Sequence, residues 1–291
     1  AYTDKGNRGE IIPAGDGKIY PGKRGATTFL HPDNGIESWN FRMKQLTLAT
    51  KDLLLRLNGR KPVRTYISGT SNGGYVTRYA IEKDPDIYDG GLDWEGPLWT
   101  PEVNSFTSKV KEIQNWKKLN DPKSSPDEKK EARIQYGFPP ESDFLMEYYV
   151  RMKRNSVDSS RMKLDPSYKP RNWWEYDQYP EDYDNYNWKS RPQEVRQAIE
   201  KFALTGAIKK PLISLHGAWD VQVHPYDNAV VYAEMIQKKG QGDMHRLYLI
   251  DHANHLDSLV GNPKVDPNYT MQPILPYYHQ AFDRLVAWVE K

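Results

Sequence analysis

A short pattern in the first third of the chain constrains the fold more than any other feature. Gly69, Ser71 and Gly73 form a Gly-x-Ser-x-Gly pattern between the apolar run 63–67 and an amphipathic stretch beginning at Asn72. This context predicts a serine on a sharp turn between a strand and a helix, where glycines let the two elements approach closely. Such a turn exposes the hydroxyl and leaves the N–H of Asn72 free to bind an oxyanion. The alternative is an ordinary loop in which Ser71 caps the helix.

Two further segments near the carboxyl terminus repeat the arrangement of an apolar run followed by a polar loop. Asp220 follows the run 211–215, and His255 follows the run 246–250. The order is therefore Ser71, Asp220, His255, each just past a predicted strand, where open α/β sheets gather their chemistry. We predict a nucleophilic serine, a histidine base and an aspartate that orients the imidazole.

Several nearby side chains are alternatives for these roles. His252 is the second choice for the base, and the alternatives for the acid are Asp93 and Glu95, at the end of the preceding predicted strand, and Asp227 on the following helix. A metal site is also conceivable, from Asp251, His252, His255 and Asp257. That set lacks the helical His-Glu-x-x-His arrangement of zinc hydrolases, so we predict no metal and no other cofactor.

Composition narrows the class of protein. A chain of 291 residues is long enough to bury a sizeable core. Its net charge of +2, from 41 basic and 39 acidic residues, gives no reason to expect a nucleic-acid partner. No apolar run approaches the ~20 residues of a membrane span. Because the chain has no cysteine, disulfides, thiol catalysis and cysteine-bound zinc are excluded.

The predicted fold is an α/β-hydrolase fold, with a mostly parallel sheet, helices on both faces and an inserted, largely helical cap. Residues 1–97 and 210–291 read as the two parts of the core, and residues 98–209 as the cap, because there helical charged segments alternate with proline-rich loops. Residues 172–188 are rich in aromatic side chains, which serve either as cap core or as a stacking pocket. The predicted substrate contacts are Trp94, Glu95, Trp173, Trp174 and Trp219.

The amino-terminal part is the least regular. The chain begins with Ala1 and without an initiator Met, which suggests a mature, trimmed or engineered start. The second oxyanion donor usually follows a His-Gly pair early in the fold, and residues 1–60 contain none. We take the loop from Asp4 to Asn7 as the candidate. Too few core strands precede Ser71, so either the first third of the fold is absent from this chain or another loop substitutes for it. A second polypeptide that completes this part of the fold is a possible partner.

These motifs resemble the tannase and feruloyl esterase group of α/β-hydrolases and the related hydroxybutyrate-oligomer hydrolases. The resemblance is carried by the segments 2–7, 69–74, 216–220 and 251–255, although the cysteines that tannases place beside the serine and before the histidine are absent. It implies a secreted serine esterase acting on phenolic or hydroxyacid esters, small or polymeric, with a bulky or aromatic acyl group. The residues themselves leave the compartment open. They also leave open a serine peptidase with the same triad, and a non-catalytic protein that binds ligands on a hydrolase scaffold.

Overall fold

The computed structural model describes residues 36–136, 138, 145, 157–165, 167–171, 175–176 and 178–291, and two short strands nearer the amino terminus. Those strands, β1 (Ile12–Pro13) and β2 (Ile19–Tyr20), form an antiparallel pair. The predicted oxyanion loop 4–7 and two predicted substrate contacts, Trp173 and Trp174, lie outside the described residues.

A sheet of four parallel strands forms the centre of the molecule. Its strands lie in the order of the chain and are β3 (Tyr66–Thr70), β4 (Gly90–Trp94), β5 (Leu212–Gly217) and β6 (His245–Ile250). Each overlaps a run that the sequence predicts to be a strand, namely 63–67, 87–94, 211–215 and 246–250. The first one begins later than predicted, because Thr65 N–H donates to the Asp89 side chain before the ladder begins, and Val63 is 80% exposed.

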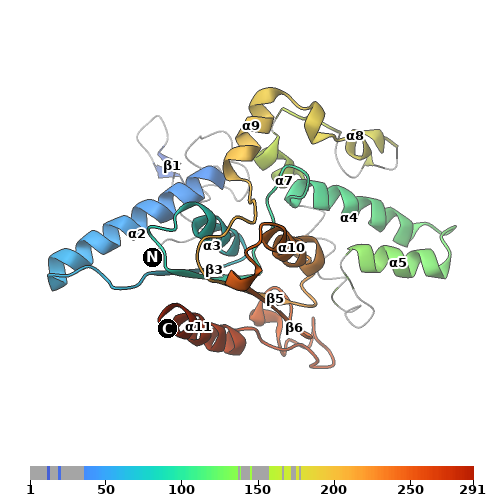
Figure 1. Ribbon diagram of the computed structural model, residues 1–291. Helices are drawn as coiled ribbons and strands as arrows, with labels where there is room; N and C mark the ends of the chain where they lie inside the picture. The colour runs from blue at the N-terminus through green and yellow to red at the C-terminus, as the bar shows by residue number, and fades with distance from the viewer. Residues whose placement is uncertain are drawn as a thin grey trace.

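Helices cover both faces of this sheet, as Figure 1 shows. One face packs against α3 (Asn72–Lys83) and α10 (Val231–Lys238). One turn of π-helix, η5 (Tyr226–Val230), comes directly before α10. The long helix α2 (Ile36–Asn58) joins the same apolar cluster through its first turn. The opposite face packs against α11 (Leu275–Val289). The predicted parallel sheet with helices on both faces is therefore confirmed.

Alternation along the strands decides which side chains lie under each layer of helices. In β4, Leu92 and Trp94 lie on the α11 side, and Asp93 points to α3. There the carboxylate of Asp93 accepts a hydrogen bond from Arg78 Nε at 2.6 Å, and both side chains are fully buried. The other oxygen of Asp93 accepts from Gly96 N–H at 2.8 Å, which fixes the loop after β4. Opposite charges buried at this distance hold the strand end against α3.

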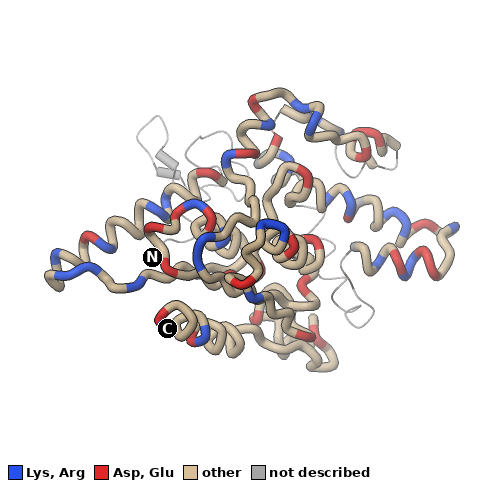
Figure 2. The backbone as a smooth tube through the Cα atoms, viewed as in Figure 1, with Lys and Arg blue, Asp and Glu red and all other residues tan. Residues whose placement is uncertain are grey.

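The described part of the chain between β4 and β5 contains helices and no strand. These helices are α4 (Ser105–Asn120), α5 (Pro126–Tyr136), α7 (Val157–Leu164), α8 (Glu181–Asp184), the short η4 (Trp188–Ser190) and α9 (Gln193–Phe202). In Figure 1 they lie to the right of the sheet and above it. Charges of both signs are interspersed along α4 and α5 (Figure 2), as expected for solvated helices. The boundaries 98 and 209 of the predicted cap stay a prediction.

Two short 3₁₀ turns complete the carboxyl-terminal part, η6 (Gly242–Met244) before β6 and η7 (Asp257–Leu259) after it. No helix in the described part of the chain has the length and apolar character needed to cross a membrane.

Candidate active site

The four strands end at one edge of the sheet, and the polar residues predicted from the sequence follow these ends. Thr70 pairs with Trp94, Trp94 with Leu215, and Gly217 with Ile250. Backbone hydrogen bonds continue the ladder beyond the strands: Ser71 N–H donates to Trp94 O at 2.8 Å, and Ala218 N–H to Ile250 O at 2.8 Å. Parallel strands thus bring loops that are far apart in sequence to a common edge.

Ser71 lies on the sharp turn between β3 and α3, with φ 58° and ψ −119°. A non-glycine residue at positive φ is strained, and such strain occurs at functional sites where the surroundings impose it. Two glycines beside Ser71 are sterically required: a Cβ on Gly69 would lie 2.5 Å from Gly73 C, and one on Gly74 would lie 2.7 Å from Gly96 Cα. A Cβ on Gly73 would meet nothing within 4 Å, so Gly69 and Gly74 are the glycines that permit the close approach of strand, helix and neighbouring loop.

The hydroxyl of Ser71 does not cap the helix that it precedes. Its side chain has no hydrogen bond with any described residue, and neither has the N–H of Asn72, the first residue of α3. The capping role that was the alternative for this serine is therefore wrong. A free N–H at a helix amino terminus, where the helix dipole is positive, suits a developing negative charge.

Asp220 and His255 meet at hydrogen-bond distance, as predicted. His255 Nδ1 lies 2.8 Å from Asp220 Oδ2, and both side chains are almost fully buried. The other oxygen of Asp220 accepts from Gln222 N–H at 2.9 Å and from Val223 N–H at 2.8 Å. Burial raises the pKa of Asp220, but the contacts with His255 and His216 outweigh it and bring that pKa below its usual value. The aspartate is therefore a carboxylate at neutral pH.

Hydrogen bonds hold the loop after β6 in place just before the histidine. Trp219 N–H donates to Ala253 O at 2.9 Å, and the backbone N–H of His255 donates to Asn254 Oδ1 at 2.6 Å. A Cβ on Gly217 would lie 2.4 Å from Ala253 O, so this loop packs directly onto the end of β5. The imidazole is thus held by its backbone and by Asp220.

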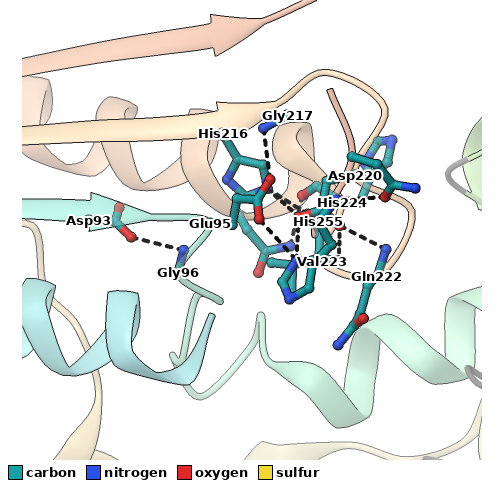
Figure 3. A network of polar contacts seen from close by, with 12 residues as sticks. Asp93, Glu95, Gly96, His216, Gly217, Asp220, Gln222, Val223, His224 and His255 are labelled. Carbon is teal, nitrogen blue, oxygen red and sulfur yellow. Dashed lines mark hydrogen bonds and ion pairs between the residues drawn. The ribbon is translucent and has the colours of Figure 1, made fainter. Parts of the chain in front are cut away.

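His216 is a second imidazole on the same aspartate, and the sequence did not single it out. Its Nε2 lies 3.1 Å from Asp220 Oδ2 and 2.6 Å from Val223 O. Both partners are acceptors, so Nε2 carries the proton. His216 is fully buried in β5 and helps to hold the aspartate in place. Figure 3 shows Glu95, His216, Asp220 and His255 gathered where β4 and β5 end.

The other predicted contact of the triad, between His255 and Ser71, is not formed. In the described structure, the Ser71 hydroxyl and His255 Nε2 do not share a hydrogen bond. Such contacts are often long in a free enzyme and shorten when substrate binds. The structure brings Asp220 and His255 together, and it places Ser71 on the same sheet edge.

Three of the alternatives named from the sequence, His252, Asp93 and Asp227, have other partners. His252 contacts the exposed Asp251 at 3.0 Å and the Trp219 ring at 4.2 Å between ring centres. Asp93 pairs with Arg78 on the α3 side, and Asp227 contacts Lys111 and His224. Among the alternatives, only Glu95 reaches the imidazole of His255.

The predicted substrate contacts stay predictions, and the placement of those that the structure describes favours other roles. Trp94 lies on the α11 side, with its ring centre 5.5 Å from that of Tyr278. Trp219 is 5% exposed and packs in an apolar cluster with Val221 and Leu259. Glu95 is fully buried.

One set of described side chains has the spacing of a metal site, namely Glu95, Asp220 and His255, whose ligand atoms lie within 4.8 Å of one another. The imidazole nitrogen and the aspartate oxygen of this set already face each other at hydrogen-bond distance. A shared proton accounts for that contact. The different set predicted as an alternative is not assembled, because Asp257 accepts hydrogen bonds from the N–H groups of Ile274 and Leu275.

No protein-family model and no curated protein matches the chain. Among solved structures it is similar to an acylaminoacyl peptidase in complex with Z-Gly-Gly-Phe-chloromethyl ketone, at 15% identity and a TM-score of 0.40, covering 80% of this chain and 25% of that one. It is also similar to feruloyl esterase B from Aspergillus oryzae, at 13% identity and a TM-score of 0.49, covering 94% and 69%. An esterase from the same organism has 11% identity and a TM-score of 0.43, covering 91% and 68%.

The chain spans about a quarter of the length of the acylaminoacyl peptidase structures. Similarities at these identities and TM-scores identify no activity. The fold itself follows from the strand order and the loops: four parallel strands, a strained serine turn after β3, an acid after β5 and a histidine after β6. The chain has the α/β-hydrolase fold.

Proposed function

We propose that this protein is a serine hydrolase that cleaves carboxylic esters through an acyl-enzyme. The observation that carries the proposal is the buried hydrogen bond between Asp220 and His255, on the same sheet edge as the strained Ser71 turn. A serine hydroxyl is a poor nucleophile at neutral pH and needs an adjacent base, and the base needs an orienting group. The proposal is supported by the position of Ser71, Asp220 and His255, which follow strand ends at one edge of the sheet in the chain order typical of this fold.

In the proposed acylation step, Ser71 Oγ attacks the ester carbonyl carbon while His255 Nε2 accepts the hydroxyl proton. Asp220 keeps the imidazole in the tautomer that has its proton on Nδ1, and stabilises the imidazolium that forms. The N–H of Asn72 donates to the tetrahedral oxyanion, and the loop from Asp4 to Asn7 is the predicted source of the second donor. When the carbon–oxygen bond to the leaving group breaks, the imidazolium returns its proton to the departing alkoxide.

In the proposed deacylation step, water takes the place of the alcohol. His255 accepts a proton from the water as its oxygen attacks the acyl carbon, and the bond to Ser71 Oγ then breaks. The proton passes to the serine, the carboxylic acid leaves, and the free enzyme is restored. These steps need no cofactor.

The finer proposal concerns the acyl group, which we infer to be bulky or aromatic. Its support is the aromatic-rich segment 172–188 within the helical insertion. The described members of that segment include Tyr176 and Tyr183, which are 7% and 1% exposed and pack in the main apolar cluster. The proposal therefore rests on the sequence pattern and on the resemblance to feruloyl esterases and tannases, and the substrate panel below decides it.

The test is hydrolysis of p-nitrophenyl acetate and p-nitrophenyl butyrate by the wild type, Ser71→Ala and Ser68→Ala. Ser68 is a matched control, because it lies on the same strand and its hydroxyl contacts Tyr278 at 2.6 Å on the α11 side. Activity that Ser71→Ala loses and Ser68→Ala retains supports the proposal. Feruloyl, galloyl and hydroxybutyrate-oligomer esters then define the acyl group.

Peptide anilides are included to test the peptidase alternative. Faster turnover of these amides than of every ester would make the protein a peptidase. Absence of turnover in all arms, in a folded protein, would instead favour a scaffold that only binds ligands.

A further inference from the structure

Glu95 occupies an unusual position directly after β4. It has φ 56° although it is not glycine, and its side chain is fully buried. Its Oε1 accepts a hydrogen bond from Gly217 N–H at 3.1 Å. Its Oε2 lies 3.4 Å from His255 Nδ1 and has no hydrogen-bond partner in the described part of the chain. The left-handed backbone therefore turns a buried carboxyl group toward the imidazole.

Two carboxyl groups consequently face one nitrogen that carries one proton. Asp220 is the nearer, at 2.8 Å, and Glu95 is at 3.4 Å. The N–H of His255 belongs to the shorter contact, so Glu95 Oε2 receives no hydrogen bond there. A charged oxygen left without a donor in a buried site is costly, whereas a protonated oxygen is itself a donor.

The surroundings of Glu95 reinforce this reading. The groups that face it are the Gly217 N–H and Trp94, the imidazole of His255, and the carboxylates of Asp220 and Asp257. No lysine or arginine contacts it among the described residues. Burial raises the pKa of Glu95 well above its usual range, and the negative charge of Asp220 raises it further.

A second buried glutamate shows the opposite arrangement. Glu82 accepts hydrogen bonds from Thr205 N–H and hydroxyl, from Gly206 N–H and from the Tyr232 hydroxyl. All of these groups are donors to Glu82. Glu95, by contrast, has the Gly217 N–H and the Trp94 side chain as donors, and it has two carboxylate neighbours, Asp220 and Asp257. Glu82 is thus a matched control for Glu95 within the same core.

We propose that Glu95 is a second acid of the site, held as a neutral carboxylic acid, and that it positions His255 while keeping that imidazole unprotonated on Nε2. The inference rests on the proposed function. In the proposed resting site, Asp220 is a carboxylate and carries the one negative charge. Of Glu95 and His255, Glu95 holds the additional proton, and the imidazole of His255 is neutral. If that proton moved to the imidazole, Glu95 would become a carboxylate and His255 an imidazolium that cannot accept the serine proton.

The charge state of Glu95 matters because of this distance. At 3.4 Å from His255 Nδ1, a carboxylate would attract the positive charge of an imidazolium, whereas a neutral carboxylic acid would not. Glutamine reproduces the neutral acid and not the carboxylate. Its Oε1 can accept from Gly217 N–H, and its amide nitrogen is a donor like the carboxylic hydroxyl.

The experiment compares the wild type with Glu95→Gln, Glu95→Ala and Asp220→Asn, and it reads the Glu95 proton directly. Infrared difference spectra should show the carbonyl stretch of a protonated carboxylic acid in the wild type at pH 7, and Glu95→Gln should lose it. In nuclear magnetic resonance spectra of labelled histidines, the His255 imidazole should be neutral at pH 7 in the wild type and in Glu95→Gln.

For ester turnover at pH 7, we expect Glu95→Gln to lose less than about tenfold. Asp220→Asn should lose about 10³–10⁴-fold, and Glu95→Ala should lose more than the glutamine variant because the imidazole has lost a neighbour. The proposal is overturned if the wild type lacks the protonated carboxyl band. It is equally overturned if Glu95→Gln loses as much turnover as Asp220→Asn, because Glu95 would then be the charged acid.

The two spectroscopic measurements need no turnover, so they separate this inference from the proposed function. A wild-type protein that shows the band and a neutral His255 but cleaves no ester would refute the function and leave the neutral acid in place. Ester turnover by a wild-type protein that lacks the band would support the proposed function and refute the neutral Glu95.

Discussion

The neutral Glu95 makes a quantitative prediction about stability as a function of pH. The pKa of Glu95 in the folded protein lies above its ordinary value of 4.5. The folded protein therefore keeps a proton that the unfolded chain releases above about pH 4.5. The contribution of this group to the free energy of unfolding is complete below that pH. It falls by about 1.36 kcal/mol per pH unit as the pH rises, until the pH passes the folded pKa.

Glutamine has no proton to release, so Glu95→Gln lacks this loss. Relative to the wild type, the variant should gain unfolding free energy as the pH rises above about 4.5, by roughly 1 kcal/mol per pH unit, until the pH passes the folded pKa. The assay is urea unfolding followed by tryptophan fluorescence at pH 5, 6, 7 and 8, extrapolated to water.

The matched control is Glu82→Gln, which places an amide nitrogen among hydrogen-bond donors. It should lower the unfolding free energy at pH 7 by about 1–3 kcal/mol, because one buried donor loses its acceptor. The reasoning would be refuted if the difference in unfolding free energy between Glu95→Gln and the wild type stayed constant from pH 5 to pH 8. Glu95 would then ionise alike in the folded and the unfolded protein.

The other predictions concern the acid, the serine turn and the buried pair beneath it. Asp220→Asn should fold but lower kcat for p-nitrophenyl butyrate by about 10³–10⁴-fold, because an amide cannot fix the tautomer of His255; kcat within tenfold of wild type would refute the assignment. Gly74→Ala should lower the unfolding free energy in urea by about 1–3 kcal/mol, because its Cβ would lie 2.4 Å from Asp93 Oδ1 and 2.7 Å from Gly96 Cα; an unchanged value would show that the turn relaxes. Asp93→Ala should cost about 3–5 kcal/mol by the same assay, because Arg78 would stay buried without its partner, and a smaller loss would mean that water reaches the guanidinium.

The strands and the serine turn could be predicted because their signals are local. Apolar runs of five residues mark buried parallel strands, and glycines on both sides of Ser71 mark a close approach of backbone segments. The contact between Asp220 and His255 could be predicted from chain order alone, since parallel strands place their following loops at one edge.

The role of Glu95 was not predictable, although the residue itself was named as a possible acid and a substrate contact. The direction of its side chain depends on a positive φ, which a glutamate in the sequence does not predict. His216 was missed for a related reason. The predicted strand ended at Leu215, whereas β5 continues to Gly217 and buries the imidazole beside Asp220.

Trp94 and Trp219, two of the predicted substrate contacts, differ in how far the sequence predicts their burial. Trp94 lies two residues after Leu92, and the period of two along a strand places both on the α11 face. That signal was available from the sequence. Trp219 lies in a loop, where no period applies, and its burial depends on the neighbouring loop that carries Ala253.

The most direct test of the proposed function is the mass of the intact protein after treatment with a fluorophosphonate, for the wild type, Ser71→Ala and Ser68→Ala, each shown to be folded by circular dichroism. A nucleophilic Ser71 predicts a single adduct on the wild type and on Ser68→Ala, and none on Ser71→Ala. A folded wild type that forms no adduct, or an adduct that persists in Ser71→Ala, would contradict it.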